Sequence, residues 1–184
     1  MSSPKSFSDQ AIVIKRHNYA EADRIVTLFT LRRGKIAAIA KGVRKSISRK
    51  APHIEPFSHT KLFFANTRGM PLITQAETLN SFPHIRDNLQ STRLAFHIIE
   101  VIDKLFPEEQ SQPEVFKAII KALTFLDSSN LTAESEQQQV VSHFHLSLLS
   151  QLGFGLPTKK DPDSLTNFIE EIIDRRLTAR KHLT

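Results

Sequence analysis

Nine basic residues between Arg24 and Ile54 are the side chains of this sequence best suited to do chemistry. No Asp or Glu interrupts the stretch, whose cations are Arg24, Arg32, Arg33, Lys35, Lys41, Arg44, Lys45, Arg49 and Lys50. A nucleic acid is a dense line of phosphates, and neutralising them releases condensed counterions. The stretch therefore predicts binding to a polyanion. Nothing in it is suited to recognising bases by sequence, so we expect contacts that position a strand.

Aromatic side chains are the second group that could contact a nucleic acid. We expect Tyr19, which lies in a polar loop predicted at residues 17–23 after the first β-rich run, to be exposed and to touch the nucleic acid. The Phe residues of the predicted strands should mostly be core, because Phe is usually buried. Phe63 and Phe64 are adjacent, so they point to opposite faces of a strand and one of them is expected outside the barrel.

Motifs of enzymes and metal sites are missing from the sequence, so we expect a binding protein without catalytic residues or cofactor. There is no Gly-rich phosphate loop, no GxSxG and no HExxH. The absence of Cys excludes disulfides and thiolate chemistry. His143 and His145 are two positions apart, which on a helix prevents shared metal binding, and we expect one at the boundary and one on the surface. No metal site is predicted.

The location of the protein is predicted from what its composition lacks. No apolar run approaches the roughly 18 residues that a membrane span needs, and the polar start MSSPKSFSDQ has no signal-peptide core. We expect a cytoplasmic protein without membrane contact.

Short strands must position the basic stretch. The β-rich runs are 11–14, 24–31, 35–40, 57–66 and 72–77. Turns are expected at Arg32–Gly34 and Thr67–Gly69, and residues 41–56 are expected to be a long mobile loop beside the first of these turns. Five strands so closely spaced predict a small closed barrel. An OB-fold is the first candidate, and an SH3-like barrel satisfies the same spacing.

After residue 80 the apolar period becomes helical. The predicted helix around Leu94 and Ile102 ends at Phe106-Pro107, and later helices begin near Pro113, Thr132 and Pro162. The charge changes at the same point, since residues 1–80 carry 14 Lys/Arg and 5 Asp/Glu, whereas residues 81–184 carry 11 and 14. The sequence therefore predicts an α+β protein of two domains, 1–80 and 81–184, of which the first meets the polyanion.

Specific residues of both halves resemble the RecO family. The opening block matches its Y-x-E-x-D-R and G-K-x-x-x-x-A-K-G-x-R segments through Tyr19, Glu21, Asp23, Arg24, Gly34, Lys35, Ala40, Lys41, Gly42 and Arg44. The segment FHLSLLSQLGFG, from Phe144 to Gly155, looks like a family helix, and Leu177 to Leu183 is similar to its C-terminal close. The resemblance spans nearly the whole chain.

The resemblance implies an N-terminal OB-fold, an all-helical C-terminal domain and a role in DNA repair and homologous recombination in bacteria, associated with the nucleoid. The implied activities are binding of single- and double-stranded DNA, strand annealing and assistance to the recombinase on DNA coated with single-strand-binding protein. The implied partners are RecR and the acidic C-terminal tail of single-strand-binding protein. Relatives often carry a four-Cys zinc module, which is missing here.

Two points of the resemblance leave alternatives open. Some relatives have basic residues just before the helix Phe, where they meet the acidic tail, and this chain has Ser142 and His143 there. Lys159 and Lys160 are candidate substitutes. From the residues alone, a generic OB-type RNA-binding module and a protein–protein adaptor also fit.

Overall fold

The computed structural model describes residues 5–128 and 133–174. These residues form two compact units, one of residues 5–81 with 107–113 and the other of residues 82–106 with 114–128 and 133–174. In the described residues no helix is long and apolar enough to cross a membrane.

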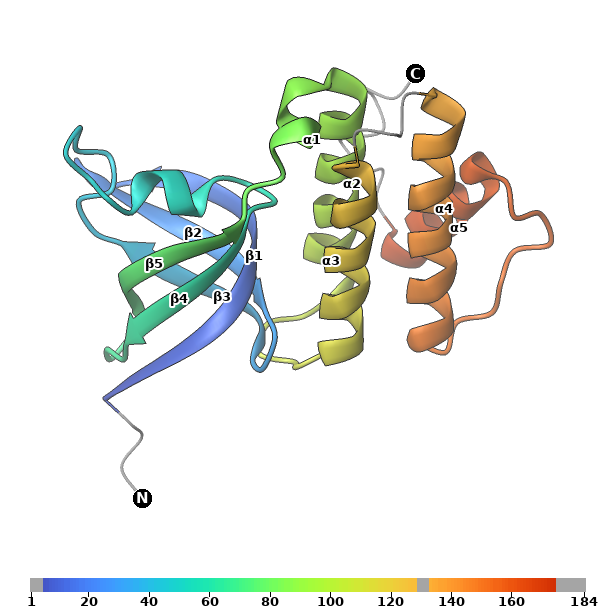
Figure 1. The fold of residues 1–184 in the computed structure, drawn as a ribbon. Helices are drawn as coiled ribbons and strands as arrows, with labels where there is room; N and C mark the ends of the chain where they lie inside the picture. The colour runs from blue at the N-terminus through green and yellow to red at the C-terminus, as the bar shows by residue number, and fades with distance from the viewer. Residues whose placement is uncertain (1–4, 129–132, 175–184) are drawn as a thin grey trace. The chain divides into compact units, whose positions relative to one another are not determined.

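The first unit is a five-stranded closed barrel (Figure 1). Its strands are β1 (Ser6–Tyr19), β2 (Asp23–Thr30), β3 (Gly34–Ala40), β4 (His59–Ala65) and β5 (Leu72–Asn80). Strand β1 pairs antiparallel with both β2 and β4, and β3 closes the barrel by a parallel pairing of Ile39 with Leu72 in β5. This order, β1-β2-β3-β5-β4, is that of the OB-fold, the first of the two expected barrels.

Buried and more exposed residues alternate along the strands, and the buried ones fill the interior of the barrel. In β3 every second residue is buried, and Leu62 and Phe64 of β4 point into the same core. Phe63 lies on the other face of β4 and is half-buried, which confirms that one of the adjacent pair lies outside the barrel. Phe29 and Phe57 are buried, as expected for Phe.

Two expectations for the barrel half are wrong. Strand β1 extends far beyond residues 11–14 and includes residues 17–19, which were expected to be a loop. Its polar end is a strand because residues 15–19 pair with β2 through their main chains. The polar side chains of these residues give no sign of this pairing in the sequence. Residues 41–56 were expected to be a long mobile loop, but Val43 and Ile54 are buried in the barrel. Residues 51–54 also form a 3₁₀ helix, η1 (Ala51–Ile54).

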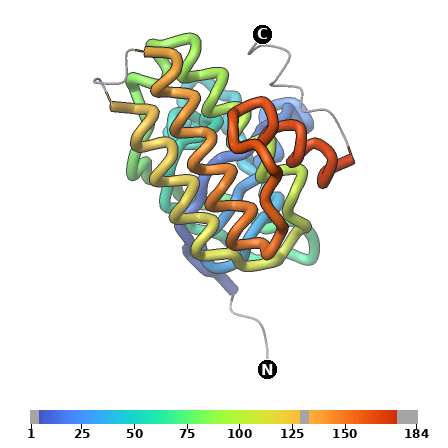
Figure 2. The backbone as a smooth tube through the Cα atoms, turned by 90° about the vertical axis from the view of Figure 1, so that its right-hand side faces the viewer, coloured from blue at the N-terminus to red at the C-terminus, as the bar shows by residue number. Residues whose placement is uncertain are grey.

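The second unit consists of helices. They are α1 (Pro83–Asp87), α2 (Leu89–Leu105), α3 (Pro113–Leu126), α4 (Glu134–Gln151) and α5 (Pro162–Ile173). Helix α2 packs against α4 and α5, and α3 runs beside α4 in both views (Figures 1 and 2). The Asp161 carboxylate caps α5 by accepting the Ser164 N–H, as expected for Asp before Pro. Short α1 was not predicted, and Thr132 lies outside the described residues.

A pair of imidazoles lies in the interior of the helical unit. His97 of α2 and His145 of α4 are each 1% exposed, and their Nε2 atoms are 3.1 Å apart. The expectation that His143 and His145 are a surface and a boundary residue is therefore wrong for His145, because α4 packs against α2 as well as α5. His143 is exposed and its Nδ1 contacts the Gln139 carbonyl at 2.8 Å.

Gly34 starts β3 where the segment 107–113 crosses the barrel. Its φ is +69°, and a Cβ built there would lie 1.9 Å from the carbonyl oxygen of Gln110. The segment is held to the strand because Glu109 donates its N–H to the Lys35 carbonyl. Glycine is required at this position by backbone angle and by space together.

We predict that Gly34→Ala lowers the free energy of unfolding by about 2 kcal/mol or more, since the side chain meets both a left-handed backbone and a main-chain clash. Chemical denaturation measures it. Gly69→Ala is the matched control, because the space around Gly69 is open and its φ is not positive. Equal effects of the two substitutions would contradict the packing of Gln110 on Gly34.

We predict that the helical unit loses stability as pH falls below about 6.5, the ordinary pKa of His. Burial, and secondarily His97, hold the pKa of His145 well below that value. Between the two pKa values the unfolded chain binds more protons, so acidification favours unfolding. The acidic residues that line the hollow beside His97 and His145 are Asp161 and Asp163.

Urea unfolding followed by the helical circular dichroism signal, at pH values from about 8 to 5, measures this dependence. His145→Phe should lose part of it, while His143→Gln, which removes an exposed imidazole from the same helix, should retain it. An unchanged pH profile in His145→Phe would show that another group causes the acid sensitivity.

Candidate nucleic-acid interface

The β2–β3 hairpin divides the predicted cations into two groups. Arg24 pairs with Ala40 at one end of the hairpin, and Thr30 pairs with Gly34 at the other. Strand β3 spans about 20 Å between them, at roughly 3.3 Å per residue. The expectation that residues 41–56 lie beside the Arg32–Gly34 turn is therefore wrong, because the chain leaves β3 at the opposite end.

Seven of the predicted site residues lie at the end where β3 runs into residues 41–50, here called the loop end: Tyr19, Arg24, Lys41, Arg44, Lys45, Arg49 and Lys50. The other three, here called the hairpin end, are Arg32, Arg33 and Lys35.

The loop end is fixed to the barrel by main-chain contacts. The Asp23 carboxylate accepts the Gly42 N–H at 2.7 Å. Arg44 donates its N–H to the Ala22 carbonyl and its guanidinium to the Glu21 carbonyl, both at 2.9 Å. Gly42 has a φ of +64°, which turns the chain toward these partners. The two motif segments that resemble the RecO family thus contact each other.

Positive charge is concentrated at the start of β2. Burial lowers the pKa of the Arg24 guanidinium, and the nearby charges of Arg16 and Arg44 lower it further. Glu55 acts in the opposite direction on Arg24 and forms an ion pair with Arg16. Arg24 therefore lies near two other guanidinium groups and one carboxylate, and a bound phosphate would relieve the repulsion it experiences. Neither Arg16 nor Glu55 was singled out from the sequence, because each is distant in the chain from the residues it meets.

The remaining side chains of the loop end differ in accessibility. Lys41, Lys45 and Arg49 are exposed. Lys50 is half-buried, and its ammonium group donates a hydrogen bond to the Ile73 carbonyl of the barrel. It is therefore less available to a ligand. Tyr19 is 47% exposed, at the end of β1. Lys41, Lys45, Arg49 and Tyr19 are thus the members most accessible to a ligand.

The hairpin end is a second, separate cationic group. The Arg32 N–H binds the Asp9 carboxylate at 3.1 Å, and the Arg33 N–H binds the Thr30 hydroxyl at 3.1 Å, so the turn is held rigidly. Lys35 lies on the outward face of β3 and is half-buried. The sequence interpretation missed Asp9 as the residue that fixes this turn.

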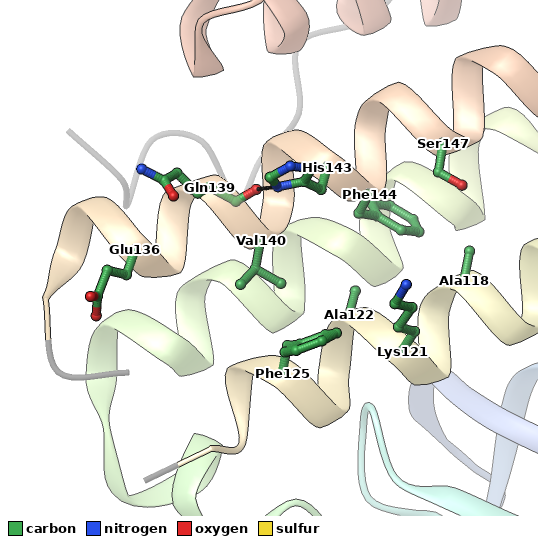
Figure 3. Close-up of a pocket in the computed structure, with 10 residues that line it drawn as sticks. All are labelled: Ala118, Lys121, Ala122, Phe125, Glu136, Gln139, Val140, His143, Phe144 and Ser147. Carbon is green, nitrogen blue, oxygen red and sulfur yellow. Dashed lines mark hydrogen bonds between the residues drawn. The ribbon is translucent and has the colours of Figure 1, made fainter. Parts of the chain in front are cut away.

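The helical unit contains an apolar groove of about 570 Å³ between α3 and α4 (Figure 3). Phe125, Val140 and Phe144 form its apolar part. Lys121 supplies a cation, with its ammonium 5.9 Å from the centre of the Phe125 ring, and His143 borders the groove from α4. The groove is suited to an amphipathic segment with negative charge.

The residues expected at an acidic-tail site separate in the structure. His143 and Phe144 line the groove, whereas Ser142 lines a different hollow and donates its hydroxyl to the Gln138 carbonyl. Lys159 and Lys160 are exposed and do not line the groove. Lys121, which the sequence analysis did not single out, is the lysine that lines it. Across residues 5–128 and 133–174 no group of three His, Asp or Glu could hold a metal ion.

Two family models match the chain. Residues 1–82 match "Recombination protein O N terminal" and residues 86–176 match "Recombination protein O C terminal". Relatives named DNA repair protein RecO include one from Syntrophomonas wolfei, which is 32% identical over 79% of this chain and 56% of its own length. Another, from Nocardioides sp., is 36% identical over 80% of this chain and 60% of its own.

A third relative of the same name, from Geobacter sulfurreducens, is 31% identical over 80% of this chain and 58% of its own length. The chain thus spans between 56% and 60% of the length of these relatives. The matches cover the barrel that carries the loop end and the helices that carry the groove, so the chain belongs to the RecO family of DNA repair proteins.

Proposed function

We propose that the protein binds single- and double-stranded DNA, anneals complementary strands and assists recombinase loading onto DNA coated with single-strand-binding protein. The observation that carries this proposal is the set of exposed cations at the loop end. Within the described residues, Lys41, Lys45 and Arg49 are exposed and form no ion pair, beside a cluster of guanidinium groups. Such a surface attracts phosphates of any sequence.

Annealing follows from the same electrostatics. Two complementary strands repel each other through their phosphates, and cations between them lower that repulsion. Members of both the loop end and the hairpin end face outward on the barrel, so more than one stretch of phosphate can be neutralised at once. The protein needs no catalytic group for this activity.

The groove between α3 and α4 supports a contact with the acidic tail of single-strand-binding protein. Its apolar part can take the apolar residues of an acidic peptide, and Lys121 can pair with a carboxylate. Glu136, at the same groove, would repel acidic residues and so favours one placement of the tail. A contact with RecR is proposed on family membership alone.

We predict that replacing Lys41, Lys45 and Arg49 by Gln weakens binding to single- and double-stranded DNA of all sequences alike. Each lost phosphate contact should reduce the slope of log K against log salt by about 0.7 to 0.9. Fluorescence anisotropy over a salt series measures the slope. Annealing of strands coated with single-strand-binding protein should slow in parallel.

The matched control replaces Lys117, Lys159 and Lys160 by Gln, which removes the same charge from exposed positions of the helical unit. It should leave the slope near the wild-type value. If both triple variants behave like wild type, the loop end is not the DNA-binding surface. An RNA oligomer of equal length in competition tests for an RNA-binding protein, which would exploit the 2′-hydroxyl.

We predict that Lys121→Glu weakens binding of a peptide with the acidic C-terminal sequence of single-strand-binding protein by about tenfold, because it replaces attraction by repulsion. Isothermal titration calorimetry measures the affinity. Lys117→Glu is the control on the same helix, since Lys117 is exposed outside the groove and pairs with Glu114. Equal losses in both variants would indicate a general charge effect and argue against the groove.

A further inference from the structure

Three planar groups are stacked at the hairpin end of the barrel. The rings of Phe7 and Phe64 are stacked with their centroids 4.6 Å apart and their planes within 15°. The guanidinium of Arg33 lies over the other face of Phe7, 3.8 Å from the ring centre. Phe64 is fully buried in the barrel core, so the stack runs from the core outward to an exposed arginine. This cation–π contact holds the exposed arginine side chain against the ring.

Arg33 borders a hollow of about 590 Å³ on the barrel. Arg33 is held at two points: its guanidinium lies over the Phe7 ring, and its main-chain N–H donates to the Thr30 hydroxyl. Arg32 and Asn66 border the same hollow, as do the carboxylates of Glu108 and Glu109. The hollow therefore combines a rigid planar cation with hydrogen-bond acceptors.

These chemical groups discriminate between the parts of a nucleotide. Two arginines and two glutamates border the hollow, so their charges balance and the hollow attracts a phosphate less than the loop end does. A base instead offers a flat face to the guanidinium and N–H donors to the carboxylates. The loop end, where the exposed lysines lie, has the opposite preference. The hollow beside Arg33 is thus suited to a base, whereas the exposed lysines of the loop end are suited to phosphates.

We propose that an unpaired base of single-stranded DNA stacks on the outer face of the Arg33 guanidinium, extending the Phe64–Phe7–Arg33 series by one planar group. This proposal rests on the proposed function and adds a base-binding position to it. A base within a duplex is already stacked on both faces and cannot enter the hollow. The site therefore increases affinity for single strands without reading their sequence.

The test compares Arg33→Lys with Arg68→Lys in the full chain, because Arg68 is an exposed arginine of the barrel that does not border the hollow. Both variants keep the charge, but only Arg33→Lys removes a guanidinium that lies over a ring. Fluorescence anisotropy measures binding to a short single strand, to the same strand with abasic sites, which keeps all phosphates, and to a duplex. Phe7→Leu is a second variant that removes the supporting ring, and thermal melts verify that each variant is folded.

Arg33→Lys should bind the intact single strand roughly fivefold or more weakly than wild type. Its affinity for the abasic strand and the duplex should be unchanged, and Phe7→Leu should behave in the same direction. Arg68→Lys should match wild type on all three probes.

Equal behaviour of Arg33→Lys and Arg68→Lys overturns the base-binding site while leaving the DNA-binding proposal intact, as does an equal loss on the abasic strand. Failure of the wild-type protein to bind any of the three probes overturns the proposed function itself, and the base-binding site with it.

Discussion

The hydrogen bond from Gly42 to the Asp23 carboxylate determines where the cations after β3 lie. A carboxylate in an otherwise basic region lowers the positive charge, so its presence needs a reason. It holds the main chain in the turn that brings Arg44 to the carbonyl groups of Ala22 and Glu21. With that turn fixed, the lysines that follow start from a defined position, and less conformational entropy is lost when they meet a strand.

Another acidic residue, Glu55, affects the electrostatics of the same part of the barrel. Glu55 pairs with Arg16 and partly offsets the lowering of the Arg24 pKa by burial, Arg16 and Arg44. Guanidinium groups stay charged under these conditions because their pKa starts far above neutrality, even when burial lowers it. The folded barrel therefore carries uncompensated positive charge, which the phosphates of a nucleic-acid backbone can neutralise.

The fold was predictable from the sequence because alternation and turn residues are local signals. The burial of Phe64 against the half-buried Phe63, and the cap of Asp161 on α5, follow from such local rules. Part of what failed depends on residues far apart in the chain. The burial of His145 follows from the packing of α4 on α2, and the position of Arg33 depends on Phe7, 26 residues earlier. The placement of residues 41–56 beside the hairpin turn was an error of another kind, because β3 follows that turn and precedes the loop, and a strand of this length separates the two by about 20 Å.

The separation of the two barrel ends has a consequence for annealing, on the functions proposed for them. A single strand can be held by its phosphates at the loop end and by one base at the hairpin end. Once that base pairs with a complementary strand, it leaves the hollow, and only the phosphate contacts remain. The paired product is then bound less tightly than a single strand held at both ends. An annealing protein needs this order of affinities, because one that held the duplex more strongly would be trapped by its own product.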